Sequence, residues 1–161
     1  SMKRVLNRNR GLTRTILPPL ANREHFGLFS RYQQRRHGGG AMVEMDFDEY
    51  RSMIERTPVE TILVEYRDDD GVLTGASLTD RIEDGLSMVY SFYEPEPARR
   101  SGGTFIILDH VRLARSWGLE YVYLGYAVEG CPNMAYKTQF QPVEVFGPEG
   151  WDLAPRTGTA G

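Results

Sequence analysis

The feature that most constrains this chain is a series of three β-rich segments followed by a long amphipathic segment. The three segments cover residues 61–66, 72–82 and 86–93. Clusters rich in Asp and Gly separate them, at residues 68–71 and 83–85, and such clusters are typical of tight turns. Because connections this short join neighbouring antiparallel strands, the pattern predicts an antiparallel meander.

A helix is expected directly after the meander, from about residue 104 to residue 117. Its spacing of apolar residues turns one face toward the sheet: Phe105, Leu108, Val111 and Leu113. Gly118 stands where a helix is commonly terminated. A further strand is expected at residues 121–126, and a possible last one at 142–146.

Two helices are expected before the meander. Asn22 can cap the first, which would run to about Arg36. Asp46 and Glu49 have the spacing of a capping box at the start of the second. The predicted domain organisation is a basic lead-in over residues 1–20, one domain over 21–153 and a flexible tail over 154–161.

This order of elements is similar to that of the GCN5-related N-acyltransferases. We therefore expect an α/β (α+β) fold, with a mixed or antiparallel sheet flanked by helices. No apolar run is long enough to span a membrane, and the first residues do not read as a secretory signal. Cys131 is the single cysteine, which excludes an internal disulfide and a cysteine-built metal site. A cytoplasmic protein with no membrane partner is the expectation.

Charge is distributed unevenly along the chain. Residues 1–40 contain nine Lys or Arg and one acid, whereas residues 41–161 contain ten basic and twenty-one acidic residues. A basic segment of this kind can bind a polyanion such as nucleic acid, because Lys and Arg displace counterions from phosphates. The alternative is that the basic and acidic surfaces neutralise each other within one fold.

A glycine-rich junction precedes the long helix. In the GCN5-related enzymes a turn of this kind holds the pyrophosphate of coenzyme A at the helix N-terminus. Arg100 and Gly103 fit that pattern, but Phe105 occupies a position that is small in those enzymes, where it should crowd a pyrophosphate. Either the junction binds no ligand, or the acyl donor is not coenzyme A.

Four long runs carry a more specific resemblance. They are RYQQRRHGGGAM (31–42), LTDRIEDGLSMVYSFYEPE (78–96), RRSGGTFIILDHV (99–111) and GLEYVYLGYAVEGCPNMAYKTQFQPVE (118–144). These runs resemble the C-terminal domain of arginyl-tRNA–protein transferases, and more closely the bacterial aspartate/glutamate leucyltransferase branch. The first twelve residues resemble the segment that leads into that domain.

The resemblance implies transfer of an amino acid from aminoacyl-tRNA to the N-terminal residue of a protein. In the bacterial branch, leucine is placed on an N-terminal Asp or Glu, which creates a degradation signal. Full members also carry an N-terminal domain with several cysteines, which is absent from this sequence. The chain departs from the family pattern at Gly102, where Leu is expected, at Ala127, where Trp is expected, and at Gly39, near a usual Asp.

The chemistry of such a transfer sets the residue types to look for. The donor is an activated ester, so no cofactor is required. The acceptor α-amine, with a reference pKa of about 7.7–8.0, must be neutral to attack. The tetrahedral intermediate needs hydrogen-bond donors, and the acidic side chain of the acceptor calls for Arg or Lys.

The predicted catalytic residues are Asp84, Tyr126 and Lys137. Asp84 could be a base or an amine-orienting group, or an ordinary turn residue. Lys137 could meet the acceptor carboxylate or the terminal phosphate, or it could be a solvated lysine. Tyr126 could equally belong to the core.

The predicted substrate-binding residues include a basic helix end, a polar strand and the glycine turn. They are Arg35, Arg36, His37, Ser87, Tyr90, Ser91, Tyr93, Arg100, Gly103, Tyr123 and Tyr136. Alternation along a strand places Ser87, Ser91 and Tyr93 on one face together with Val89, and Tyr90 on the other. Two further functions stay open at this point, a coenzyme A-dependent N-acyltransferase and a non-catalytic module that binds tRNA or a degradation signal.

Overall fold

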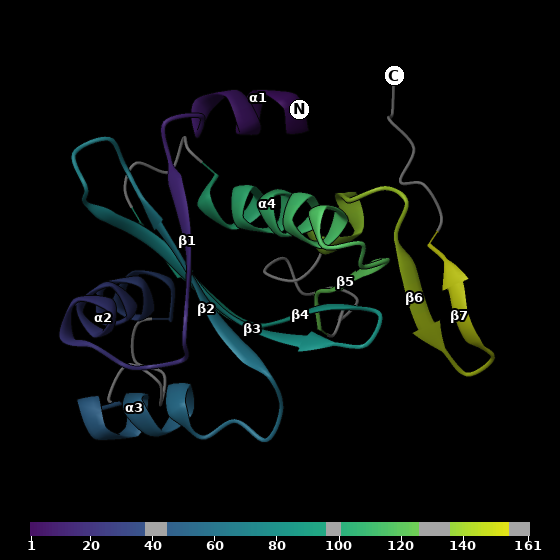
Figure 1. Ribbon diagram of the computed structural model, residues 1–161. Coiled ribbons are helices and arrows are strands. Elements are labelled where there is room, and N and C mark those ends of the chain that lie inside the picture. The colour runs from purple at the N-terminus through teal and green to yellow at the C-terminus, as the bar shows by residue number, and fades with distance from the viewer. Residues whose placement is uncertain (38–44, 96–100, 126–135, 155–161) are drawn as a thin grey trace. The chain divides into compact units, whose positions relative to one another are not determined.

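The computed structural model describes residues 1–37, 45–95, 101–125 and 136–154 (Figure 1). Within these ranges the side chains of residues 37, 136 and 138 are not described. The chain divides into two compact parts, residues 1–123 and 124–161.

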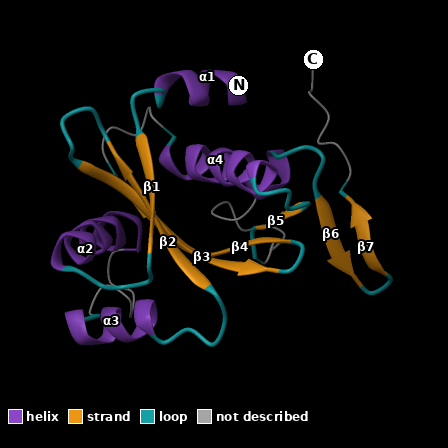
Figure 2. Ribbon diagram, viewed as in Figure 1, coloured by secondary structure: helices purple, strands orange, loops and turns teal. Residues whose placement is uncertain are grey.

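The first part contains a five-stranded sheet in the order β1-β2-β3-β4-β5 (Figure 2). The strands are β1 (Thr13–Leu17), β2 (Thr61–Arg67), β3 (Leu73–Ile82), β4 (Gly85–Tyr93) and β5 (Tyr121–Tyr123). Strands β1 to β4 are antiparallel, and β5 runs parallel to β4. The predicted meander and the α/β (α+β) class are confirmed.

Helices cover both faces of this sheet (Figure 1). They are α1 (Met2–Arg8), α2 (Arg23–His37), α3 (Phe47–Glu55) and α4 (Gly102–Ser116). Helices α2 and α3 lie on one face, where Phe29, Tyr50 and Phe92 are almost fully buried. Helices α1 and α4 lie on the other, over Val64 and Tyr66. The sheet therefore has an apolar layer on each side.

The predicted helix caps are confirmed. Asn22 Oδ1 accepts a hydrogen bond of 2.7 Å from the His25 N–H. Asp46 accepts from the Glu49 N–H at 2.8 Å, and the Glu49 carboxylate accepts from the Asp46 N–H at 2.9 Å. Each cap satisfies backbone N–H groups that have no partner inside their helix.

Strand β1 is an element that the sequence pattern did not predict. It lies within residues 1–20, which were expected to lead into the fold, and it pairs with β2 from Thr13↔Arg67 to Leu17↔Leu63. Four of its five residues are exposed. An exposed edge strand of this kind lacks the alternation of apolar and polar residues that identifies a half-buried strand.

Strand β4 contains a β-bulge at Val89. Tyr90 pairs with Leu78 and Met88 pairs with Thr79, so the exposed Val89 has no opposite residue. Such an insertion reverses the alternation of faces beyond it. The prediction that Ser87, Ser91 and Tyr93 share one face is therefore wrong.

The residues around the bulge show which faces are involved. Leu86 and Met88 pack toward α4, so Ser87 between them points to the opposite face. Beyond the bulge, Ser91 lies on the α4 face, where it bonds Ser77. Tyr90, the neighbour of Ser91 in the strand, points to the opposite face and packs in the cluster beneath α2 and α3.

The second part contains the 3-10 helix η3 (Tyr136–Gln139) and a hairpin of β6 (Glu144–Gly147) and β7 (Gly150–Leu153). The possible strand at 142–146 therefore exists as β6, paired with β7 in a sheet of two strands. The strand expected at 121–126 ends at Tyr123. None of the helices in the described ranges combines the length and apolarity needed to cross a bilayer.

Candidate active site

Tyr93 covers the glycine-rich start of α4. A Cβ atom at Gly102 would lie 2.7 Å from Tyr93 Cδ2, and one at Gly103 would lie 3.1 Å from Tyr93 Oη. Ser101, which precedes them, has a φ of 50° and makes no side-chain cap. The two glycines are thus required for Tyr93 to pack on the first turn of the helix.

The end of α2 meets Tyr93 at the same place. Arg36 Nη1 donates a hydrogen bond of 2.7 Å to Tyr93 Oη. The Arg36 guanidinium carbon lies 5.7 Å from the centre of the Tyr32 ring, and the Tyr32 and Tyr93 rings are 4.9 Å apart. We call this group, with Tyr90 and Gly103, the Arg36–Tyr93 site.

Two tyrosines of this site, Tyr32 and Tyr90, remain protonated at neutral pH. Burial raises the pKa of Tyr32, and it raises the pKa of Tyr90 to about 12, against the opposing charge of Arg36. Phenols in this state act as hydrogen-bond donors and acceptors rather than as bases. A guanidinium held among phenols is suited to a carboxylate or a phosphate.

An ion pair fastens α2 to the strand next to this site. Arg31 Nη2 lies 3.2 Å from Glu94 Oε2, one residue beyond the end of β4. Both side chains are largely exposed, so the pair contributes little to stability. Its effect is to hold the end of β4 beside α2.

Strands β4 and β5 separate beyond a short paired region. Gly85–Ser87 pair with Tyr121–Tyr123. Among the described residues, no strand pairs with β4 from Met88 onward on that side. This part of β4 includes the bulge at Val89 and ends at Tyr93 of the Arg36–Tyr93 site.

Asp84 has a clear structural role. Its carboxylate accepts a hydrogen bond of 2.9 Å from Tyr123 Oη. Its backbone carbonyl accepts from the N–H groups of Glu120 and Tyr121, at 3.1 and 3.0 Å. These bonds hold the start of β5 against β4. They favour the interpretation of Asp84 as a structural residue of the turn.

Asp84 and Tyr123 lie at the far end of β4 from Tyr93. Strands rise by about 3.3 Å per residue, which puts the two ends of β4 about 26 Å apart. A single small substrate group cannot contact both ends. The structure thus brings Arg36, Tyr90, Tyr93 and Gly103 together, and it leaves a catalytic role for Asp84 as a prediction.

Ser87 and Arg35 are not brought into contact with this group. Ser87 is half-buried on the α2 and α3 face of the paired end of β4, and Arg35 is exposed on α2 next to Arg36. Their predicted contacts with substrate stay predictions.

Several predicted site residues belong to the second part or lie outside the described residues. Lys137 lies in η3, where burial lowers its pKa, and a Cβ at Gly125 would be 3.8 Å from its Nζ. Arg100 and Tyr126 fall outside the described residues, as do the side chains of His37 and Tyr136. Their proposed roles stay predictions.

A buried polar network joins Ser91 to α4. Ser91 Oγ lies 3.0 Å from Ser77 Oγ, which lies 3.2 Å from Thr79 Oγ1. Thr79 Oγ1 lies 2.9 Å from His110 Nε2, and His110 Nδ1 lies 2.7 Å from the Ile106 carbonyl oxygen. A carbonyl can only accept, so Nδ1 carries the proton and Nε2 accepts from Thr79. Burial lowers the pKa of His110, which keeps the ring neutral.

Of the residues of α4 predicted to face the sheet, Phe105 and Leu113 are buried as expected, but Val111 is not, and the predicted set left out His110. Val111, predicted to face the sheet, is 47% exposed, whereas His110 is fully buried. The true stripe is Ile106, His110 and Leu113, with the helical spacing of three and four. Treating His as a polar surface residue concealed this spacing.

A second missed group ties β1 to α4. Arg14 Nη1 donates to both carboxylate oxygens of Asp109, at 3.1 and 3.0 Å. Tyr66 Oη donates to Asp109 Oδ2 at 2.8 Å. One of the basic residues near the N-terminus is therefore neutralised inside the fold.

The position of Phe105 changes one argument from the sequence. Its ring is buried against Tyr66, 5.6 Å between centroids, so it points into the core and not toward the glycine turn. The expectation that Phe105 crowds a pyrophosphate is wrong. Tyr93 covers the turn instead.

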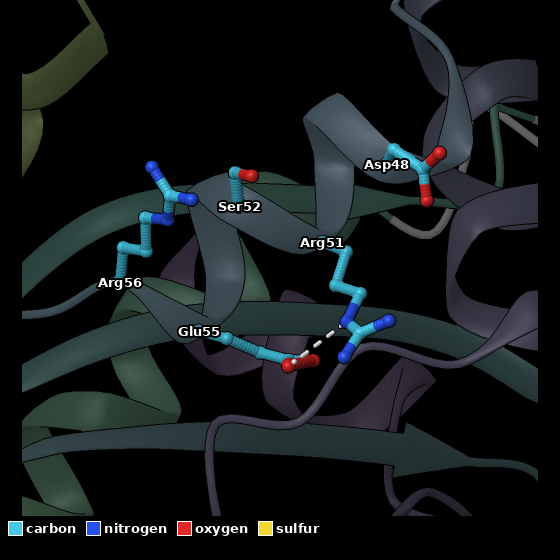
Figure 3. Close-up of a pocket in the computed structure, with 5 residues that line it drawn as sticks. All are labelled: Asp48, Arg51, Ser52, Glu55 and Arg56. Atoms are coloured by element: carbon cyan, nitrogen blue, oxygen red, sulfur yellow. Dashed lines mark hydrogen bonds and ion pairs between the residues drawn. The ribbon is translucent and has the colours of Figure 1, made fainter.

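An open surface hollow lies on α3 (Figure 3). It is lined by Asp48, Arg51, Ser52, Glu55 and Arg56. Arg51 Nε lies 3.2 Å from Glu55 Oε1. The hollow contains none of the predicted site residues, and its alternating charges are those of an ordinary solvated helix face. No group of three or more His, Cys, Asp or Glu within the described ranges could hold a metal ion.

The sheet order, the separation of β4 from β5 and the position of α4 define an acyltransferase fold of the GCN5-related class. Solved structures agree. L-PGS from Bacillus licheniformis superposes with a TM-score of 0.58 at 15% identity, over 83% of this chain and 42% of that one. A Klebsiella pneumoniae protein described as an acyl-CoA N-acyltransferase superposes with a TM-score of 0.55 at 14% identity, over 84% of this chain and 86% of that one.

Sequence comparison gives the family within that class. The family described as "Arginine-tRNA-protein transferase, C terminus" matches residues 24–147, so the chain belongs to this family. It is 49% identical to the aspartate/glutamate leucyltransferase of Paramagnetospirillum magneticum, over 98% of this chain and 65% of that protein. It is 50% identical to the enzyme of the same name from Ruegeria sp., over 91% of this chain and 54% of that protein. The chain thus spans between 54% and 65% of the length of these relatives.

Proposed function

We propose that this chain carries the transferase centre of an aminoacyl-tRNA–protein transferase. It would move leucine from leucyl-tRNA to the N-terminal Asp or Glu of a protein, and its relatives carry the name aspartate/glutamate leucyltransferase. The observation that carries the proposal is the Arg36 guanidinium, held by Tyr93 Oη beside the first turn of α4. Charged tRNA is cytoplasmic, so we expect the chain to act there, and to mark its protein substrates for degradation as the family resemblance implies.

Arg36 supplies the acidic selectivity that such an acceptor requires. The carboxylate of an N-terminal Asp or Glu needs a cation, and a guanidinium binds it with directed, charge-assisted hydrogen bonds. Tyr93 and Tyr32 hold the guanidinium at the end of α2. The acceptor carboxylate would therefore be bound at the start of α4, where Arg36 and Tyr93 meet.

The reaction itself is an ester-to-amide exchange. The neutral α-amine attacks the ester carbonyl of leucyl-tRNA, a tetrahedral intermediate forms, and the carbon–oxygen bond to the terminal ribose breaks. The proton that the amine loses passes, directly or through a water molecule, to the ribose oxygen, which leaves as a hydroxyl. Backbone N–H groups at the unpaired edge of β4 are suited to stabilise the developing oxyanion.

One observation weighs against coenzyme A as the donor. The ring of Tyr93 lies on Gly102 and Gly103, at the turn that would receive a pyrophosphate. An aminoacyl ester presents a ribose and not a pyrophosphate close to the reacting carbonyl. The covered turn is therefore compatible with a tRNA donor.

Substitution of Arg36 tests the proposal. Loss of a charge-assisted hydrogen bond costs about 1.5–3 kcal/mol, so Arg36→Ala should lower kcat/KM for leucine transfer to an Asp-initiated peptide about 10- to 100-fold. Arg36→Lys should restore part of the loss. Arg56→Ala, on the exposed face of α3, is the matched control and should leave transfer unchanged.

Equal transfer by the wild type and Arg36→Ala would contradict the assigned site. Absence of transfer by the folded wild type would contradict the proposed function itself.

A further inference from the structure

Helices α1 and α4 lie next to each other on one face of the sheet (Figure 1). The apolar residues Val5 and Leu6 of α1 pack against Phe105 and Ile106 of α4. Six exposed basic residues lie on these two helices and the loop after α1, and we call them the basic face: Lys3, Arg4, Arg8, Arg10, Arg112 and Arg115.

No acidic residue interrupts the basic face. Residues 1–12 and 110–118 contain no Asp or Glu. The single acid of α4, Asp109, is buried and paired with Arg14. Two acidic residues lie at the edges of the basic face. Asp69 lies beside Gly11, and Glu120 follows the end of α4.

The opposite side of the sheet has a different charge pattern. On α3, Arg51 and Arg56 are interleaved with Asp48 and Glu55 (Figure 3). The chain as a whole has a net charge of −3. Helix α2, on the same side as α3, carries four Arg residues against Glu24, and one of them, Arg31, is paired with Glu94. The α1 and α4 side differs in that its six exposed basic residues have no acid among them on either helix, which is an arrangement that can steer a polyanion to that surface.

We infer that the basic face binds the phosphate backbone of the donor tRNA, an assignment that rests on the proposed function. Lys and Arg on such a face gain affinity by displacing counterions from phosphates. A lipid surface fits less well, because membrane-bound helices insert an apolar face. The apolar residues of α1 are instead used in packing on the core.

The course of α4 connects this face to the Arg36–Tyr93 site. The helix begins under Tyr93 and has 15 residues, which at 1.5 Å each is about 22 Å. Arg112 and Arg115 lie in its second half. A donor whose 3′ end reaches the start of α4 would place its following phosphates along α4 and α1.

Binding of uncharged tRNA to the intact chain across a salt series tests the inference. Arg112→Gln/Arg115→Gln should lower affinity at least about tenfold at low salt, and should reduce the slope of log K against log salt by about two. Arg51→Gln/Arg56→Gln on α3 removes the same charge and is the matched control, expected to change affinity less than about twofold. Lys3→Gln/Arg4→Gln provides a second variant on α1, in case the α4 variant unfolds.

Three results would overturn the inference. The first is an α3 control that weakens binding as much as the α4 variant. The second is an α4 variant that lowers the melting temperature without changing affinity, since cations near a helix C-terminus also stabilise the helix. The third is charge-dependent binding to phosphatidylglycerol vesicles without binding to tRNA. Charge-dependent tRNA binding without leucine transfer would support the face and count against the proposed function.

Discussion

At the scale of single residues, the partners of a side chain decide its chemistry here. His110 and Arg36 are both polar residues on helices, yet one is sealed in the core and the other reaches the site. Burial lowers the pKa of His110 and keeps the ring neutral, while Thr79 and the Ile106 carbonyl are the hydrogen-bond partners of its two ring nitrogens. Arg36 is directed by Tyr93 and Tyr32. One partner of each, Ile106 or Tyr32, is four residues away on the same helix. The other partners, Thr79 and Tyr93, come from distant strands, so neither role could be predicted from local pattern alone.

His110 should make stability depend on pH. Burial lowers its pKa in the folded state, whereas in the unfolded chain its pKa is about 6.5. As pH falls through 6.5 the unfolded chain takes up a proton that the folded chain does not, so the free energy of unfolding falls. The free energy of unfolding should therefore be lower at pH 5.5 than at pH 7.5.

Urea unfolding at the two pH values measures this loss. The variant His110→Gln should show a smaller decrease than the wild type, whatever its absolute stability. The charged groups that act on the ring are Asp109 and Arg14. Equal decreases in both proteins would contradict a neutral buried His110.

At the scale of elements, local signals predicted most of the architecture. The Asn22 and Asp46 caps, the turns between the strands and the Gly118 terminus are encoded by neighbouring residues, and each is confirmed. Strand β1 was missed because its hydrogen bonds go to β2, about fifty residues away. The bulge at Val89 was missed because nothing in an alternating strand marks an extra residue. That bulge decides which residues share a face with Tyr93.

Two glycines in helices should respond in opposite ways to the same substitution. In Gly102→Ala the new Cβ would lie 2.7 Å from the Tyr93 ring, and such overpacking costs about 1–3 kcal/mol. In Gly27→Ala the new Cβ would meet only the flexible Arg31 Nη1, at 3.6 Å, and Ala within a helix gains about 0.5–1 kcal/mol over Gly.

Chemical denaturation of the two variants gives the comparison. Gly102→Ala should unfold at a lower urea concentration than the wild type, and Gly27→Ala at a higher one. Gly102→Ala should also lower leucine transfer, because it displaces the partner of Arg36. A stabilised Gly102→Ala would show that Tyr93 does not pack on α4.

At the scale of the whole molecule, the distribution of charge between the two sides of the sheet links binding to chemistry. The sequence predicted a basic N-terminal segment but could not show which charges are neutralised. Arg14 is paired with the buried Asp109, whereas Lys3 and Arg4 are exposed on α1 and no ion pair with an acid is found for them among the described residues. Arg112 and Arg115, from the acidic part of the sequence, join them through the packing of α1 on α4. A donor tRNA bound along α1 and α4 and an acidic acceptor bound at Arg36 would then meet at the start of α4.

Transfer of radiolabelled leucine, and separately of arginine, from charged tRNA to peptides that begin with Asp, Glu or Ala tests this account most directly. The chain should transfer leucine to the Asp and Glu peptides and not to the Ala peptide, without any added cofactor. Transfer of neither amino acid by folded protein would contradict it, and so would transfer of an acetyl group from coenzyme A to the same peptides.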